Sequence, residues 1–242
     1  MTFKDCYKII NGDCLEEMRK MADNSIDYIF TSPPYNDSAK TKRDIETKRH
    51  CKYKEIEYRK DWFEWQCEVI DEMLRITKEI VMYNIQPILS NKKDVYRLIG
   101  KYADKIDQII IWYKPNAQPQ HYEHRIANAY EMVLILRGGD FDTLYVEDNI
   151  SNVVIQNINS DREYNEIHRA IMSKGFADYM IQQFTKEETT VLDPFSGLAT
   201  TGIACINQNR KYIGIEKDKE YADLSIKRIE KRTLVNGLFD EL

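Results

Sequence analysis

The stretch TTVLDPFSGLATTGIACINQNRKYIGIEKD, residues 189–218, decides the fold of this chain. Its first part, TTVLDPFSG (189–197), indicates a buried strand that ends in a turn. ATTGIACINQ (199–208) then indicates a helix, and KYIGIEKD (211–218) indicates a second strand. Buried strands that are separated by helices are typical of parallel sheets with helices on both faces.

The same alternation of strands and helices continues through the rest of the chain. Apolar runs predict strands at 5–10, 25–31, 79–85, 105–114, 129–137 and, over a short length, 152–156. Helical periodicity predicts helices at 13–21, from 61 onward, and at 91–102, 174–184 and 218–234. The sequence therefore predicts an α/β fold with a doubly wound, mostly parallel sheet, in a single domain that spans residues 1–242.

The composition is that of a soluble globular protein. Hydrophobic residues make up 43% of the 242 residues and charged residues 31%, which is ordinary for this class. No apolar run approaches the roughly 18 residues of a membrane span, and the N-terminal segment shows no signal-peptide pattern. Five cysteines without a CxxC pair favour reduced thiols in a cytoplasm and argue against a metal site.

One segment is strongly basic, although the net charge of the chain is −5. Residues 40–60 carry nine Lys or Arg against four Asp or Glu, within a predicted insertion at 36–60. A small basic patch on an acidic body is one way for a protein to bind DNA at a single place. We expect Lys48, Arg49, Lys52 and Lys54 to contact phosphate, and a solvated, mobile loop is the alternative.

Three predicted strands end in residues suited to ligands, which in doubly wound sheets bind beyond the carboxyl ends of the strands. Gly197 lets the backbone approach a ligand closely. The helix that follows begins with Thr200 and Thr201, where free amide groups can meet an anion. Glu216 ends the next strand and suits a pair of ribose hydroxyls. A tight turn without a ligand is the alternative.

The third strand of this kind runs into IFTSPPYN, residues 29–36. Two prolines stop the strand abruptly because neither can donate a hydrogen bond to a sheet, and an ordinary turn would show the same pattern. Ser32 and the carbonyl of Pro33 nevertheless place two acceptors side by side, and Tyr35 adds an aromatic face. Adjacent acceptors on a rigid corner can hold an amino group in one orientation.

Together these motifs resemble the β class of DNA amino-methyltransferases. DPFSGLATTG followed by YIGIEKD is similar to the part of that family that binds S-adenosylmethionine (SAM), and SPPY is similar to its catalytic tetrapeptide. The catalytic segment precedes the cofactor segment, which is the permuted order of this class. Further segments that resemble family patterns are NGDCLEEM (11–18), IIIWYKPNAQP (109–119), the YE of AYEMVLIL, and HRAIMSKGFADYMI (168–181).

The resemblance implies methyl transfer from SAM to the exocyclic amino group of a DNA base that has left the stack. Ser32 and the Pro33 carbonyl would hold the amino group, Pro34 would keep the corner rigid, and the Tyr35 ring would stack on the base. The candidate cofactor contacts are Asp13, His168, Asp193, Phe195, Gly197, Thr200, Thr201 and Glu216. A helix cap is the alternative for Asp13, and a structural histidine is the alternative for His168.

The chain also departs from the family pattern. Ala199 stands where the family usually has a second glycine, and Arg169 and Ser173 replace two prolines. The polar region 138–167 is short for a target-recognition region, which is its expected role. Double-stranded DNA is the implied partner, and a homodimer and a cognate restriction enzyme are compatible with the resemblance.

The target base and the substrate class each leave an alternative. Serine in FTSPPY more resembles enzymes that methylate cytosine N4, whereas an aspartate at this position is commoner in adenine N6 enzymes. We expect cytosine N4, with adenine N6 as the alternative. A methyltransferase that acts on RNA, protein or a small molecule, and a non-catalytic DNA-binding relative, are the alternatives of another class.

Overall fold

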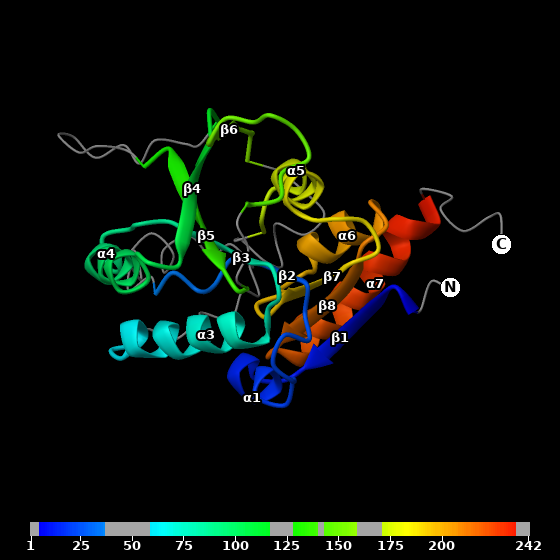
Figure 1. Ribbon diagram of the computed structural model, residues 1–242. Helices are drawn as coiled ribbons and strands as arrows, with labels where there is room; N and C mark the ends of the chain where they lie inside the picture. Colours follow the sequence, from blue (N-terminus) through cyan, green and yellow to red (C-terminus); the bar gives the residue numbers. More distant parts are fainter. Residues whose placement is uncertain (1–4, 37–58, 117–127, 140–142, 159–170, 236–242) are drawn as a thin grey trace, which may run out of the picture.

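The computed structural model describes residues 5–36, 59–116, 128–139, 143–158 and 171–235 (Figure 1). The strands are β1 (Tyr7–Asn11), β2 (Tyr28–Thr31), β3 (Ile80–Ile85), β4 (Ile106–Tyr113), β5 (Tyr130–Arg137), β6 (Val153–Ile155), β7 (Thr190–Asp193) and β8 (Lys211–Glu216). The helices are α1 (Cys14–Met18), α3 (Trp62–Ile76), α4 (Lys92–Lys101), α5 (Lys174–Phe184), α6 (Thr200–Ile206) and α7 (Lys219–Val235). The elements predicted from the sequence are present, the short strand at 152–156 included, and only their ends are shifted.

All described strands belong to one sheet of eight, in the order β1-β8-β7-β2-β3-β5-β4-β6. Neighbouring strands are parallel except for β5, which runs antiparallel to both β3 and β4. The predicted fold class, a mostly parallel doubly wound sheet, is confirmed. Because β5 is reversed, its first residues lie at the edge where β2, β3, β7 and β8 end.

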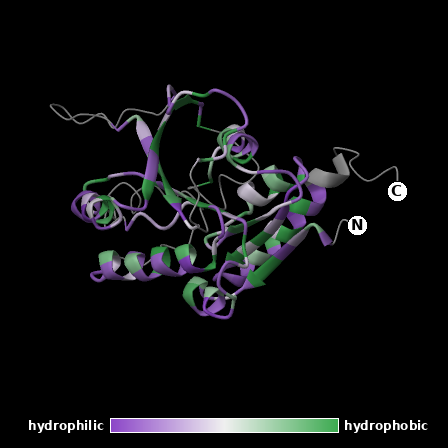
Figure 2. Ribbon diagram, viewed as in Figure 1, coloured by the Kyte–Doolittle hydropathy of each residue, from purple (hydrophilic) through white to green (hydrophobic). Residues whose placement is uncertain are grey.

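Helices cover both faces of the sheet, and this explains why the strands are so apolar. One hydrophobic core lies between the sheet and α1, α3 and α4, and the other lies between the sheet and α5, α6 and α7 (Figure 1). The strands between these layers are largely hydrophobic in Figure 2, and every residue of β3 is buried. In the second core, Trp112 of β4 stacks on Phe176 of α5 with ring centroids 4.2 Å apart.

Two segments that the sequence singled out are only partly described. Of the basic insertion at 36–60, the structure describes Asn36, Arg59 and Lys60. Its two ends are tied together, because the Asn36 side chain donates to the Arg59 carbonyl at 2.9 Å and accepts from the Arg59 amide at 2.8 Å. In the region 138–167, the described part contributes β6 to the sheet beside β4. Among the helices of the described ranges, none is both long and apolar enough to cross a membrane.

Candidate active site

A buried hydrogen bond joins the carboxyl ends of β2 and β7 at one edge of the sheet. Thr31, the last residue of β2, donates from Oγ1 to Oδ1 of Asp193 at 2.7 Å. Thr201 of α6 donates to the other oxygen, Oδ2, at 2.9 Å, and Asp193 is only 4% exposed. Because Ser32 follows Thr31 directly, the Asp193 carboxylate connects the SPPY corner to the turn after β7.

The turn between β7 and α6 contains two residues in the left-handed region, Gly197 with φ 52° and Ala199 with φ 55°. The Phe195 amide begins the turn by donating to Asp193 Oδ1 at 3.1 Å, and the Phe195 ring meets Trp65 of α3 edge-on at 5.8 Å. Glycine adopts this backbone conformation freely, whereas a residue with a Cβ loses roughly 1–2 kcal/mol. The departure from the family pattern at Ala199 therefore falls on a strained, fully buried position.

Glu216, at the end of β8, holds the same turn from the other side. Its Oε2 accepts from the Gly197 amide at 2.8 Å, and its Oε1 accepts from the Asp218 amide at 2.8 Å. Burial, the largest cause, raises the pKa of the Glu216 carboxyl, while these two amides act to lower it. Each carboxylate oxygen keeps one lone pair, so the two oxygens can still accept hydrogen bonds from the two ribose hydroxyls of SAM.

The other predicted cofactor residues near this edge have protein partners for their side chains. The Thr200 hydroxyl accepts from the Arg228 guanidinium at 3.0 Å, which directs it toward α7. Asp13 caps α1, since its Oδ1 accepts from the Leu15 amide at 3.0 Å. Its Oδ2 lies 3.3 Å from Lys217 Nζ. The helix cap, the alternative interpretation of Asp13, is therefore confirmed, and a contact to the cofactor remains a proposal.

The SPPY corner is held at its backbone by α3 and by the residue before α4. The Pro34 carbonyl accepts from the indole Nε1 of Trp62 at 2.9 Å. The Tyr35 carbonyl accepts from Nδ2 of Asn91 at 2.8 Å. Both donors are buried, Trp62 at 1% exposure and Asn91 at 0%. Two prolines and two buried anchors leave this corner little freedom to move.

The side chains of the corner enter a polar network that contains a buried ion pair. Ser32 Oγ lies 3.1 Å from the Tyr35 hydroxyl, which donates to Glu131 Oε2 at 2.8 Å. Asn84 Nδ2 lies within hydrogen-bond distance of all three groups, at 3.3 Å from Ser32, 3.1 Å from Tyr35 and 2.7 Å from Glu131. Lys114 Nζ pairs with the other oxygen of Glu131, Oε1, at 2.7 Å.

Asn84 and Glu131 are site residues that the sequence analysis did not assign. Asn84 is a polar residue inside a wholly buried strand, with 1% of its surface exposed. Glu131 is an acid at the second position of a strand whose following residues, 132–136, are all apolar. Isolated polar residues near the ends of buried strands were the signal that could have found them. Lys114 is buried beside Glu131, with 7% of its surface exposed.

Five of the predicted site residues lie outside the described residues. They are His168 and the basic residues Lys48, Arg49, Lys52 and Lys54. The described candidates, in contrast, lie at the carboxyl ends of β1, β2, β7 and β8 and in the segments that follow these strands.

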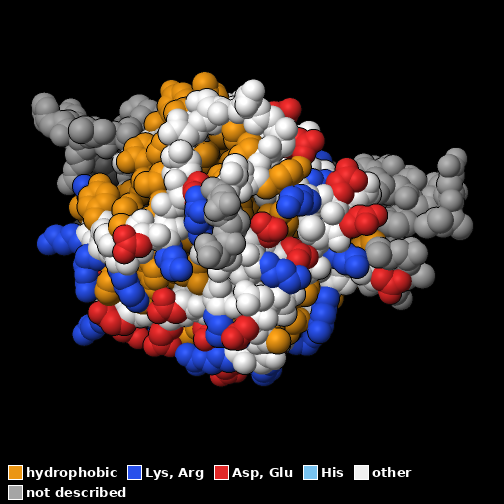
Figure 3. All heavy atoms as spheres, viewed as in Figure 1, with side chains coloured by type: hydrophobic (Ala, Val, Ile, Leu, Met, Phe, Trp, Pro, Cys, Tyr) orange, Lys and Arg blue, Asp and Glu red, His pale blue; other side chains and the backbone are white. Residues whose placement is uncertain are grey.

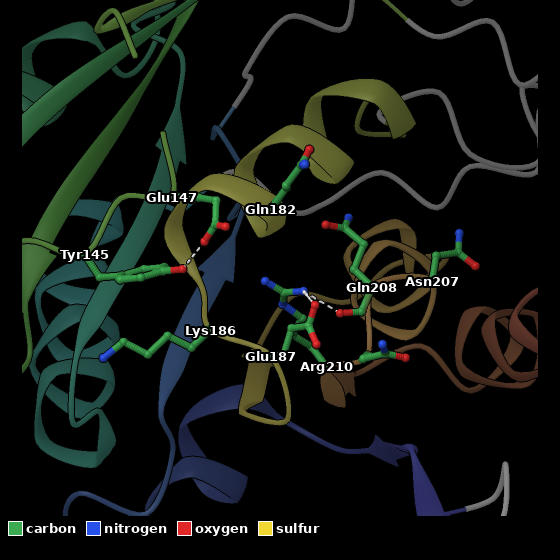
Figure 4. Close-up of a pocket in the computed structure, with 9 residues that line it drawn as sticks. Tyr145, Glu147, Gln182, Lys186, Glu187, Asn207, Gln208 and Arg210 are labelled. Atoms are coloured by element: carbon green, nitrogen blue, oxygen red, sulfur yellow. Dashed lines mark hydrogen bonds and ion pairs between the residues drawn. The ribbon is translucent and has the colours of Figure 1, made fainter. Parts of the chain in front are cut away.

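A separate polar pocket lies at the opposite edge of the sheet (Figure 4). Its lining comes from residues that precede β7 and β8, and from the end of α5 and the segment around Tyr145. Some of its polar groups pair with one another or with the backbone, as in the bonds from Tyr145 to Glu147 and from Arg210 to the Gln208 carbonyl. None of the residues that line it belongs to the SPPY corner.

The glycine turn after β7, the acid at the end of β8 and the SPPY corner after β2 lie together at the carboxyl ends of the strands of a doubly wound sheet. This arrangement defines a SAM-dependent methyltransferase. The profile of the DNA methylase family, the N6 and N4 methyltransferases, matches residues 26–227. The type II methyltransferase M2.MboI of Moraxella bovis is 27% identical over 248 aligned residues, which cover 95% of this chain and 89% of that protein.

Solved structures share the fold. The PvuII DNA methyltransferase (cytosine-N4-specific) has a TM-score of 0.71 at 18% identity, with 97% of this chain and 93% of that chain covered. The M1.HpyAVI–SAM complex has a TM-score of 0.61 at 22% identity, with 92% of this chain and 98% of that chain covered. This chain belongs to the DNA methylase family, and it is a SAM-dependent DNA amino-methyltransferase.

The buried carboxyl of Asp193 predicts a specific pH dependence of stability. Burial raises its pKa to about 6, although Thr31, the Phe195 amide and Thr201 act to lower it. The folded-state pKa lies above the unfolded value of about 3.9, so the contribution of this group to stability falls as the pH rises from about 4 to about 6. We expect Asp193→Asn to remove that contribution, which is at most roughly 3 kcal/mol.

Urea unfolding at a series of pH values between 4 and 7 measures this effect. The exposed Asp223→Asn variant is the control, and it should keep the slope of the unmodified protein. Glu216, whose pKa is also raised, should leave a smaller residual slope in Asp193→Asn. An Asp193→Asn protein with an undiminished slope would contradict the assignment.

Proposed function

We propose that this protein transfers the methyl group of SAM to the exocyclic amino group of a base in double-stranded DNA, with cytosine N4 favoured over adenine N6. The observation that carries the proposal is the Asp193 carboxylate, which binds Thr31 next to the SPPY corner and Phe195 in the glycine turn. It holds the proposed acceptor and the proposed cofactor site against each other.

The chemistry needs an acceptor for the N–H groups because an exocyclic amino group is a poor nucleophile, with its lone pair delocalised into the ring. We propose that Ser32 Oγ and the Pro33 carbonyl accept these N–H groups and turn the lone pair toward the methyl group. SAM supplies that methyl group on a sulfonium. The Tyr35 ring offers a face for the base to stack on, and its hydroxyl, which is bonded to Glu131, restricts the ring to one orientation.

For SAM we propose contacts from the edge formed by β1, β7 and β8. Glu216 would take the ribose hydroxyls, Phe195 would pack on the cofactor, and Gly197 would allow close backbone approach. Asp193 would orient the methionine amino end with its remaining lone pair. The further proposed contacts are Asp13, His168, Thr200 and Thr201, of which the two threonines would contribute through their backbone.

The preference for cytosine rests on Ser32 and on its resemblance to the N4 enzymes. A hydroxyl is a neutral acceptor, weaker than the aspartate that is commoner in adenine N6 enzymes. Both amino groups can nevertheless bond to a hydroxyl, so adenine N6 is the second candidate.

Incubation with SAM and unmethylated mixed-sequence duplex DNA, followed by digestion and mass spectrometry of the nucleosides, tests the proposal. We expect N4-methylcytosine. If N6-methyladenine were the only product, adenine would be the target base instead of cytosine, and the proposed site residues would not be contradicted. DNA that stays unmethylated by a protein that binds SAM would contradict the proposed substrate, and RNA, protein and small molecules would then be tried.

The cofactor assignment predicts that Glu216→Ala weakens SAM binding about ten- to hundredfold, because a charge-assisted hydrogen bond contributes roughly 1.5–3 kcal/mol. Isothermal titration calorimetry measures the affinity. Glu220→Ala, which removes an exposed acid from the first turn of α7, is the matched control and should bind SAM normally. A folded Glu216→Ala protein with unchanged affinity would remove Glu216 from the site.

For DNA binding we propose the basic insertion, with Lys48, Arg49, Lys52 and Lys54 on phosphates. On the face shown in Figure 3, the described basic and acidic side chains are intermixed, so that face offers no other continuous basic patch. Replacing all four residues with alanine should lower the log–log salt slope of DNA binding by about 0.9 per lost phosphate contact. SAM affinity should not change. An unchanged slope would indicate a loop without a role in DNA binding.

We propose a cytoplasmic protein that reads its DNA site with the region 138–167, forms a homodimer and accompanies a cognate restriction enzyme. Light scattering of the purified protein tests the dimer. Exchange of 138–167 with the corresponding segment of a relative tests the reading of the site, since the methylated sequence should change.

A further inference from the structure

The carboxylate of Glu131 is a buried charge close to the proposed acceptor. Its side chain is 13% exposed and that of its ion-pair partner Lys114 is 8% exposed. Lys114 Nζ approaches Oε1, whereas the Tyr35 hydroxyl and Asn84 approach Oε2. Glu131 thus has one oxygen for the ion pair and one oxygen for the side chains around Ser32.

The ionised carboxylate sets the direction of the hydrogen bonds that lead to Ser32. A carboxylate can only accept, so the Tyr35 hydroxyl must donate its single proton to Glu131. Burial, and then the charge of Glu131, raises the pKa of Tyr35 well above its usual value, which keeps this proton in place. Between Ser32 and Tyr35 either oxygen can be the donor. Because the Tyr35 proton is already used, Ser32 donates and Tyr35 accepts.

This direction determines what Ser32 has left for a substrate. A serine hydroxyl has one proton and two lone pairs. The proton goes to Tyr35, and one lone pair faces Nδ2 of Asn84 at 3.3 Å. The second lone pair is therefore free to accept an N–H group. If the bond to Tyr35 ran the other way, Tyr35 and Asn84 would occupy both lone pairs and Ser32 would present its proton instead.

We infer that Glu131 is a positioning residue for methyl transfer: acting through Tyr35, it fixes the Ser32 hydroxyl as an acceptor for the amino group of the target base. The inference rests on the proposed function. It adds a role for the Tyr35 hydroxyl that is separate from the stacking face of the Tyr35 ring, and it explains why a charged pair is buried beside a neutral acceptor.

The variant Glu131→Gln should reverse the chain of hydrogen bonds. Lys114 carries three N–H donors and no acceptor, so it favours the carbonyl oxygen of the new amide on its own side. The amide NH₂ then faces Tyr35 and donates to its oxygen. Asn84 Nδ2, which can no longer donate to this position, keeps Ser32 as its acceptor. The Tyr35 proton is released toward Ser32, which loses its free lone pair. In Tyr35→Phe, by contrast, the chain is cut and Ser32 is free to turn in either direction.

These two variants therefore predict an unusual pattern of rates. Tyr35→Phe should lower the single-turnover rate of methyl transfer about three- to tenfold, the value of one ordinary hydrogen bond. Glu131→Gln should lower it further, because the wrong direction is enforced. In the double variant the reversed chain no longer reaches Ser32, so adding Tyr35→Phe to Glu131→Gln should raise the rate to that of Tyr35→Phe alone.

The assay uses tritiated SAM and unmethylated mixed-sequence duplex DNA, both saturating. The Kd for SAM, measured by calorimetry, and the KM for DNA should stay within about twofold of the values of the unmodified protein for all three variants. Tyr102→Phe is the matched control, since the Tyr102 hydroxyl also donates to a carboxylate, Asp71 Oδ1, at 2.7 Å, on the packed surface between α3 and α4. It should lose stability without losing rate.

Each outcome decides between the alternatives. A double variant that is slower than both single variants, with multiplying losses, would show that Glu131 and Tyr35 act independently and would overturn the inference. Single variants with normal rates would overturn it as well. An unmodified protein that binds SAM but labels no DNA would overturn the proposed function and the inference with it. A double variant restored to the Tyr35→Phe rate supports the inference.

Discussion

The buried carboxylate of Asp193 is the interaction on which the arrangement of the site depends. A carboxylate away from water is stable only when it is well hydrogen-bonded. The three donors to Asp193 come from the end of β2, from the turn after β7 and from α6. None of these segments can move without leaving a buried acceptor partly unsatisfied. The same side chain therefore fixes the distance between the two halves of the site, which are more than 150 residues apart in the sequence.

The sequence predicted those parts of the site whose cause is local. Gly197 and Glu216 stand out because a turn and a strand end need such residues, and the two prolines after Ser32 mark a corner in any context. For Asp13, local sequence predicted a helix cap, and the structure shows Asp13 capping α1. The alternation of predicted strands and helices along the chain was sufficient to predict the mostly parallel sheet.

Local pattern marks Glu131 and Asn84 only as polar residues in apolar strands, and it does not reveal that they meet, because their meeting depends on the one reversed strand. The first residues of β5 reach the site only because β5 runs against β3, with Ile85 opposite Met132 in the register. If β5 were parallel, Glu131 would lie at the far edge of the sheet. Local patterns do not reveal the direction of a strand, and the strain at Ala199 likewise appears only once the backbone is known.

The order of the strands in the sheet has a consequence for how the chain folds. β1 pairs with β8, so that Tyr7 lies opposite Tyr212, and β2 pairs with β7, so that Tyr28 lies opposite Val191. β1 and one side of β2 therefore stay unpaired until β7 and β8 have been synthesised, although the other side of β2 pairs with β3. Contacts of such sequence separation slow folding and leave strand edges open in the meantime. Formation of the β1–β8 and β2–β7 pairs should thus be among the slow steps of folding.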